Sequence, residues 1–194
     1  MARRITIIQG HPDPAGGHLC HALAAAYAAG AAEAGHEVRP IEVAALDLPL
    51  LRTKAEFETG APPADARAAQ AAIGWAQHLV IVYPLWLGTM PALLKGFLEQ
   101  TFRPGFAFET DPAGARTRPL KGRSARIVVT MGMPALAYRW YFGAHSLKSL
   151  ERNILGFCGI RPIRASLFGM VEAAEDRKRQ LWLATLRAHG RRAR

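Results

Sequence analysis

The chain has 194 residues, half of them hydrophobic, and a formal net charge of +10. This length favours one domain, residues 1–194, with a sizeable core. No run approaches the roughly 18 apolar residues of a membrane-spanning helix, and the apolar run at residues 5–8 is shorter than a signal-peptide core of about 7–15 residues. A cytoplasmic protein is therefore expected. The basic charge is compatible with binding of an anionic cofactor, an acidic partner or nucleic acid. It is also compatible with a composition that is rich in arginine throughout and has no functional meaning.

The two cysteines, Cys20 and Cys158, form no CxxC motif and have no metal-ligand spacing. We expect two buried, reduced thiols, with a disulfide or a reactive thiol as the alternative. No metal site is predicted.

Short apolar runs rich in β-branched residues alternate with longer helical segments along the chain. The runs predict strands at residues 5–8, 37–43, 79–83, 125–130 and 161–168. The helical segments are residues 19–34, 64–76, 91–101, 146–157 and 172–189, with Ser146 as a candidate N-cap. This alternation predicts an α/β fold with a parallel sheet. Five strands fit the flavodoxin-like order 2-1-3-4-5 with helices on both faces.

Proline 40 lies inside the second predicted strand. Proline has no backbone N–H to donate, so it is tolerated at a sheet edge. The order 2-1-3-4-5 places this strand at an edge, which is consistent with Pro40. Three long connections, residues 44–63, 102–123 and 131–145, are expected to be functional or mobile.

Residues 9–19 follow the first strand and open the first helix. Gly16 and Gly17 allow the backbone to approach a ligand, and the N–H groups of the helix start can face an anion. An ordinary βα loop is the alternative. The segment matches neither GxGxxG nor a Walker A loop, which disfavours a dinucleotide Rossmann domain or a P-loop NTPase.

Residues 83–97 form an apolar segment in which a strand ends at Tyr83 and a helix starts at Pro91. Such a loop is rarely exposed without a ligand or partner. A flat aromatic cofactor beside Trp86 would suit it, and packing on the protein's own core is the alternative.

Residues 130–145 begin with Thr130, Gly132 and Met133 and continue into an aromatic stretch. Aromatic side chains here could wall a pocket for a flat substrate. Tyr138 offers a hydroxyl and His145 a titratable ring, although each residue taken alone is more often structural.

Together these segments resemble the NAD(P)H:quinone oxidoreductase family, the flavodoxin-like flavoenzymes related to DT-diaphorase. The modulator-of-drug-activity proteins and the ancillary subunits of potassium efflux systems are similar. The resemblance covers residues 5–167 and is most specific at residues 83–97, then at Gly10-His11-Pro12 and at residues 148–160. It implies a flavin, FAD or FMN, that is reduced by NAD(P)H and passes hydride to a quinone or a similar small-molecule acceptor by a ping-pong mechanism.

The resemblance also implies residue roles. The flavin phosphates would contact His11, Gly17, His18 and Leu19. The isoalloxazine ring would lie along Pro84, Leu85, Trp86 and Leu87, with its polar edge at Thr130, Gly132 and Met133. Tyr138 and His145 would act near the site of hydride transfer. The phosphate loop departs from the family, because Gly16, Gly17 and His18 stand where hydroxyl side chains are usual, so phosphate binding must rest more on backbone amides.

Family members are typically homodimers, and we expect residues 138–142 at the subunit boundary. Two other functions stay open: an ancillary subunit that regulates a membrane potassium transporter, and a one-electron carrier like flavodoxin. Nucleic-acid binding is disfavoured, because no binding motif accompanies the charge.

Overall fold

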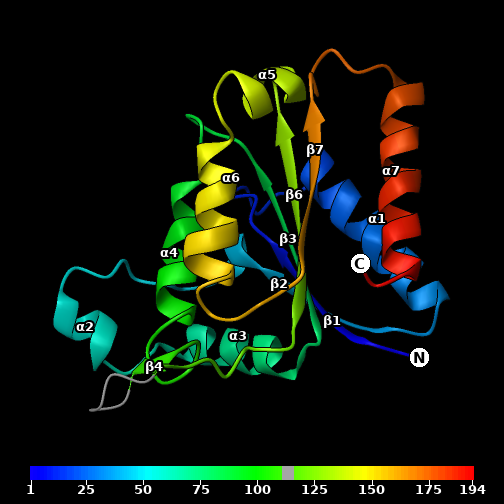
Figure 1. The fold of residues 1–194 in the computed structure, drawn as a ribbon. Helices are drawn as coiled ribbons and strands as arrows, with labels where there is room; N and C mark the ends of the chain where they lie inside the picture. Colours follow the sequence, from blue (N-terminus) through cyan, green and yellow to red (C-terminus); the bar gives the residue numbers. More distant parts are fainter. Residues whose placement is uncertain (111–115) are drawn as a thin grey trace.

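The computed structural model describes residues 1–110 and 116–194. Within them, five parallel strands form one sheet in the order β2-β1-β3-β6-β7 (Figure 1). The strands are β1 (Arg4–Gln9), β2 (Glu37–Glu42), β3 (His78–Pro84), β6 (Ser124–Met131) and β7 (Ile163–Gly169). Counted along the chain, these five strands have the predicted order 2-1-3-4-5, which is confirmed.

Strand β2 lies at one edge of the sheet, paired only with β1 in the described chain. Pro40 stands opposite Ile7 in this pair. The missing N–H of Pro40 is tolerated because no further strand of the described residues lies beyond β2.

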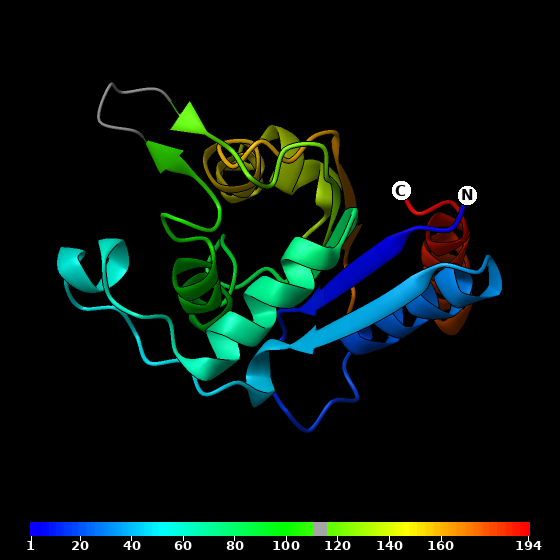
Figure 2. The same cartoon turned by 90° about the horizontal axis from the view of Figure 1, so that it is seen from below.

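Helices cover both faces of the sheet, as predicted (Figures 1 and 2). One face carries α1 (Leu19–Glu33) and α7 (Asp176–Arg191). The other carries α3 (Ala64–Trp75), α4 (Ala92–Thr101) and α6 (His145–Ser149), which continues as the π-helix η2 (Leu150–Leu155). Alternate side chains of each strand point to opposite faces, so Val80 packs in the cluster under α1 and α7 whereas Leu79 packs in the cluster on the other side.

Helices α1 and α7 cross at two glycines. A Cβ atom on Gly30 would lie 2.0 Å from the carbonyl oxygen of Arg187, and one on Gly190 would lie 2.1 Å from that of Tyr27. The two backbones are therefore in direct contact, and only glycine fits at either position. This crossing fixes the position of α1 against α7, and the first turn of α1 adjoins the loop after β1.

The long connections contain short elements that the sequence did not reveal. They are η1 (Val43–Ala45), α2 (Lys54–Glu58), β4 (Glu109–Thr110), β5 (Arg116–Thr117) and α5 (Ala135–Trp140). Residues 111–115, part of the predicted connection 102–123, lie outside the described residues.

The prediction of Ser146 as an N-cap is wrong. Helix α6 starts at His145, and its N-cap is Ala144, in the left-handed region at φ 48°. The Ser146 hydroxyl lies inside the first turn and hydrogen-bonds the Tyr138 hydroxyl at 2.7 Å.

Both cysteines are free and buried, as expected. Across the described ranges 1–110 and 116–194, no helix has the length and apolar character needed to cross a membrane.

Candidate functional site

The loops that follow β1, β3, β6 and β7 meet at the carboxyl edge of the sheet, where open α/β folds bind ligands. They enclose a cavity of about 250 Å³. Its lining residues are His11, His18, Leu19, Cys20, Pro84, Leu85, Trp86, Thr130, Met131, Gly132, Val171 and Glu172. The three loops singled out in the sequence therefore contribute to one cavity.

The loop from β1 to α1 has the features of an anion site. Gly16 and Gly17 have φ of 73° and 78°, and no atom lies within 4 Å of a Cβ built on either. Glycine is required here by the backbone conformation and not by crowding. The first N–H groups of α1 have no partner within the helix, and no acidic residue stands in its first turn, so these groups are suited to an anionic ligand.

Three histidines surround this loop. The His11 and His18 rings stack with centroids 3.9 Å apart, and the His21 ring lies 5.2 Å from His11 and 5.7 Å from His18. His11 is buried and accepts the backbone N–H of Asp13 at Nδ1, which leaves Nε2 to carry the proton of the neutral ring. Burial, then the neighbouring His18 and His21, lower the pKa of His11, while Asp13 acts to raise it. An anion beside the His11 ring would favour its protonated form.

Asp13 gives this loop its shape. One carboxylate oxygen accepts the Ala15 N–H at 2.9 Å, and the other lies 2.7 Å from His18 Nε2. The His18 hydrogen bond, followed by that from Ala15, lowers the pKa of Asp13. The carboxylate therefore holds His18 in place beside the cavity.

The loop after β3 supplies an apolar wall. Trp86 and Thr89 exchange two backbone hydrogen bonds of 2.8 and 2.9 Å around Leu87 and Gly88. Both central residues have positive φ, 46° and 77°, as in a type I′ turn. A left-handed leucine costs about 1–2 kcal/mol, and the Leu87 side chain is fully exposed. The turn thus presents Trp86 and Leu87 at the surface, where an aromatic ligand or a partner can cover them.

The end of β6 and the loop after β7 supply the polar edge. The backbone N–H of Leu85 donates to the Thr130 carbonyl at 2.7 Å, which joins the β3 and β6 ends. A Cβ on Gly132 would lie 3.7 Å from a Glu172 carboxylate oxygen, so Glu172 approaches the backbone of this loop. Gly169 is required for a close approach, because a Cβ there would lie 2.4 Å from the Ala135 nitrogen.

Most of the predicted flavin-binding residues line the cavity. Eight do so: His11, His18, Leu19, Pro84, Leu85, Trp86, Thr130 and Gly132. Gly17, Leu87 and Met133 do not, although each belongs to a loop that does. Cys20, Met131, Val171 and Glu172 were missed. Val171 and Glu172 could have been found, because they follow the last parallel strand and all carboxyl ends share one edge.

Tyr138 and His145 do not line this cavity. Tyr138 is buried, and its hydroxyl bonds Ser146 Oγ and accepts the Leu147 N–H at 3.2 Å. His145 is exposed, with its ring against Gly143. Their roles in hydride transfer stay predictions.

The expected boundary stretch, residues 138–142, is largely exposed. Tyr138 is the exception, whereas Trp140, Tyr141 and Phe142 are 78%, 84% and 52% exposed and Leu136 is 71% exposed. We call these four exposed side chains the α5 patch: Leu136, Trp140, Tyr141 and Phe142. Helix α5 stands beside the carboxyl ends of β6 and β7 (Figure 1).

Residues 3–189 match a family model described as a flavodoxin-like fold. The chain belongs to the flavodoxin-like fold family. Among curated relatives of this family, an uncharacterized NAD(P)H oxidoreductase of Haemophilus influenzae is 30% identical over 62% of this chain and 60% of its own length. The chain thus spans less than two thirds of that relative.

Two further proteins match different shares of this chain. An FMN-dependent NADH:quinone oxidoreductase of Ruegeria pomeroyi is 34% identical over 30% of this chain and 28% of its own length. The structure of an NAD(P)H:quinone oxidoreductase from Methanothermobacter marburgensis covers all of both chains with a TM-score of 0.82 at 22% identity, a likeness of fold.

Proposed function

We propose that this protein is a flavin-dependent NAD(P)H oxidoreductase that reduces quinones or similar flat acceptors. One observation carries the proposal: a glycine loop with His11 and His18, an apolar wall at Trp86 and a polar edge at Thr130 and Gly132 border a single cavity. Each of these three surfaces suits one part of a flavin. The names of the Haemophilus and Ruegeria relatives, an NAD(P)H oxidoreductase and an FMN-dependent NADH:quinone oxidoreductase, support the same assignment.

The groups around the cavity fit a flavin mononucleotide. The α1 N-terminus, with His18 and His11, would hold the phosphate, because N–H groups and imidazolium rings both pair with anions. Leu85 and Trp86 would lie along the isoalloxazine ring, and the backbone around Gly132 would bond its polar edge. The name of the Ruegeria relative favours FMN over FAD. When bound, the flavin would accept hydride from NAD(P)H and pass it to the acceptor.

The protein's own residues would then orient and shield the reactants. Trp86 is half exposed and would cover one side of the site. Glu172, whose carboxylate approaches the Gly132 backbone, would disfavour negative charge that builds up nearby. A single open cavity suits a ping-pong order, in which the nicotinamide leaves before the acceptor binds.

We further propose that a second copy of the chain covers the α5 patch. Four large exposed apolar side chains on one short segment are unusual on a free surface. A partner there would also border the candidate site, because α5 follows the loop at Gly132. The function as an ancillary subunit of a potassium transporter stays a prediction.

Steady-state kinetics with NADH or NADPH and a soluble benzoquinone test the proposal. A ping-pong mechanism gives parallel double-reciprocal lines, whereas intersecting lines would contradict the ping-pong order. Absence of NAD(P)H oxidation in flavin-loaded protein would contradict the activity itself.

The variant Trp86→Ala tests the site. Loss of ring contact worth about 1–1.5 kcal/mol should weaken flavin binding roughly tenfold. Leu181→Ala, which removes an exposed apolar side chain on α7, is the control and should bind flavin as the unaltered protein does.

A further inference from the structure

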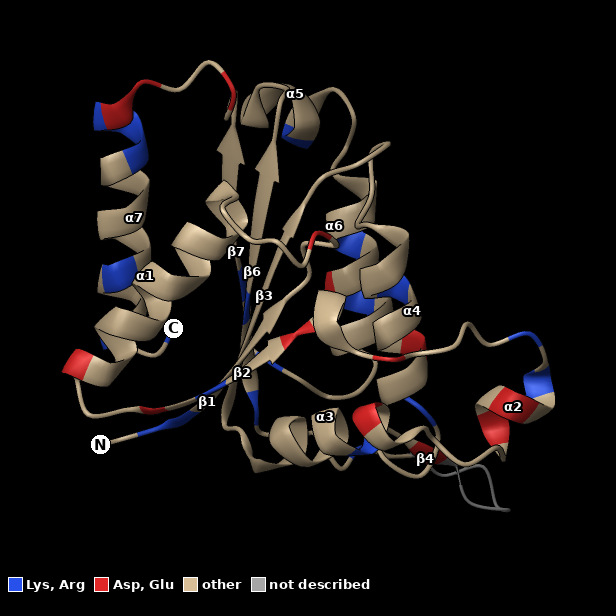
Figure 3. Ribbon diagram, turned by 180° about the vertical axis from the view of Figure 1, so that it is seen from behind, with Lys and Arg blue, Asp and Glu red and all other residues tan. Residues whose placement is uncertain are grey.

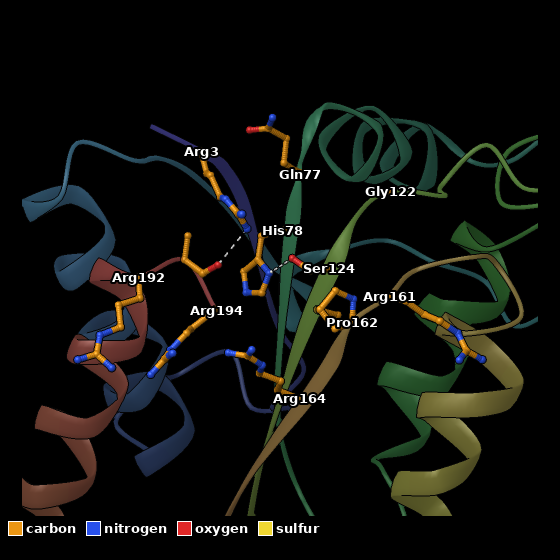
Figure 4. Close-up of a pocket in the computed structure, with 12 residues that line it drawn as sticks. Arg3, Gln77, His78, Gly122, Ser124, Arg161, Pro162, Arg164, Arg192 and Arg194 are labelled. Atoms are coloured by element: carbon orange, nitrogen blue, oxygen red, sulfur yellow. Dashed lines mark hydrogen bonds between the residues drawn. The ribbon is translucent and has the colours of Figure 1, made fainter. Parts of the chain in front are cut away.

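A second cavity lies at the opposite, amino end of the sheet, with a volume of about 460 Å³. The segment before β1, the first residues of β3, β6 and β7, and the segment after α7 form its walls (Figure 4). The chain ends meet there, and Arg3 Nη1 donates to the Ala193 carbonyl at 3.4 Å (Figure 2). Strand β3 runs from His78 in this cavity to Pro84 in the candidate flavin site, a separation of about 20 Å.

Every charged side chain in the described lining of this cavity belongs to an arginine, and together they are Arg3, Arg161, Arg164, Arg192 and Arg194. Figure 3 shows Lys and Arg at both chain ends and on the neighbouring strand ends. In the described part of the chain, no ion pair joins any of the five to a carboxylate. By contrast, Arg187 and Arg191 on the adjoining turns of α7 both pair with Glu33.

A further guanidinium lies beneath the cavity. Arg126 on β6 is 4% exposed and donates to the main-chain oxygen of Arg194 and to Ser166 Oγ, both at 2.6 Å. Among the described residues, no Asp or Glu side chain forms an ion pair with Arg126. Arg126 therefore adds a further guanidinium to the arginines around the cavity.

The wall also contains an unpartnered donor. His78 is 1% exposed, and its Nδ1 lies 2.7 Å from Ser124 Oγ. Its Nε2 atom is buried without a hydrogen-bond partner in the described structure. When the Ser124 hydroxyl donates to Nδ1, Nε2 carries the ring proton and can donate to a ligand. A buried polar group without a partner is unfavourable, so a ligand that accepts this N–H would be stabilised.

We propose that this cavity binds a small, multiply charged phosphate compound. Guanidinium groups match phosphate oxygens in charge and geometry. The ligand would neutralise Arg164, Arg192 and Arg194 and accept the free N–H of His78. The cavity exceeds the size of one phosphate group and lies within the range of small-molecule sites. The site is distinct from the flavin cavity and does not depend on the proposed oxidoreductase function.

Calorimetric titration of the full-length, flavin-loaded protein with inorganic phosphate, pyrophosphate and tripolyphosphate tests the site. We expect affinity to increase with the number of phosphates, and the double variant Arg164→Gln/Arg192→Gln to weaken pyrophosphate binding at least tenfold. The control is Arg177→Gln, an exposed arginine in the first turn of α7, at the other end of the same helix. It removes one positive charge outside the cavity, where the double variant removes two inside it, and should retain the affinity.

Nitrogen-15 NMR of the His78 ring in the unaltered protein provides a readout that needs no variant. Pyrophosphate should shift the Nε2 resonance of His78 in step with the calorimetric saturation. No binding below millimolar concentration, an equal loss in Arg177→Gln, or an unchanged His78 resonance at saturation would each overturn the proposal. None of these outcomes bears on flavin binding, which is measured separately from the visible spectrum.

Discussion

The imidazole rings of His11 and His18 lie stacked, with their planes inclined by 15°. Burial, and then repulsion from the neighbouring His18 and His21 rings, lower the pKa of His11. A phosphate at the α1 N-terminus would raise that pKa again. Binding would therefore take up protons, and by linkage the affinity must increase as the pH falls toward the pKa of His11.

We expect FMN to bind more tightly at pH 6.5 than at pH 8, by roughly three- to tenfold, since a one-unit pKa shift corresponds to about 1.4 kcal/mol. Quenching of FMN fluorescence at several pH values measures the affinity. Riboflavin, which lacks the phosphate, is the control and should bind with little pH dependence. An equal pH dependence for both ligands would show that the histidines do not face the phosphate.

Gly17 and Gly35 have similar backbone conformations and surroundings, so the same substitution can be compared at the two positions. Their φ angles are 78° and 73°, and neither has an atom within 4 Å of a built Cβ. Gly17 adjoins the cavity, whereas Gly35 follows the other end of α1. Alanine at either position should cost about 1–2 kcal/mol of unfolding free energy through backbone strain alone, measured by urea denaturation.

Only Gly17→Ala should also weaken FMN binding, because the strain moves the amides that face the phosphate. Similar losses of FMN affinity in Gly17→Ala and Gly35→Ala would mean that the loop acts through stability and not through contact.

Gly30 lies at the α1–α7 crossing, where a Cβ would meet a backbone carbonyl at 2.0 Å. Gly30→Ala should therefore lower the free energy of unfolding by about 1–3 kcal/mol, as overpacking does. Gly74→Ala is the control, because its nearest contact would be a Phe106 ring atom at 3.7 Å and the site lies in helix α3. It should stabilise the protein by about 0.5–1 kcal/mol. If Gly74→Ala also destabilised the protein, the effect of Gly30→Ala could not be assigned to crowding at the α1–α7 crossing.

The α5 patch predicts the oligomeric state. Tyr141→Glu places a charge on a side chain that is 84% exposed, so the monomer fold should tolerate it while a dimer across the patch should not. Sedimentation velocity should show a dimer for the unaltered protein and a monomer for the variant. Leu181→Glu, on α7 away from α5, should stay dimeric. A monomer at all concentrations before substitution would refute the proposed boundary.

The sheet order could be predicted because uniform apolar runs mark strands buried on both faces, and Pro40 is consistent with an edge. Because the strands are parallel, the loops that contain Gly17, Trp86 and Gly132 were then expected at the same, carboxyl edge of the sheet. Tyr138 could not be placed in this way. It stands in a six-residue helix, α5, too short for a periodic pattern, and its burial depends on contact with Ser146 and Leu147 from the next helix.

The arginine cavity was also invisible in the sequence. Arg3, His78, Ser124, Arg164 and Arg192 are far apart along the chain. The register of β3, β6 and β7 brings His78, Ser124 and Arg164 to one end of the sheet, and the two chain ends place Arg3 and Arg192 beside them. The net charge of +10 does not point to this cavity, because composition does not reveal which arginines lack acidic partners.

The flavin content of the purified protein tests the central claim most directly. The protein should be yellow, and acid release followed by chromatography should identify FMN at close to one molecule per chain, restored to that level when apoprotein is incubated with FMN. Colourless protein that takes up neither FMN nor FAD at micromolar concentration would contradict the assignment of the carboxyl-edge cavity.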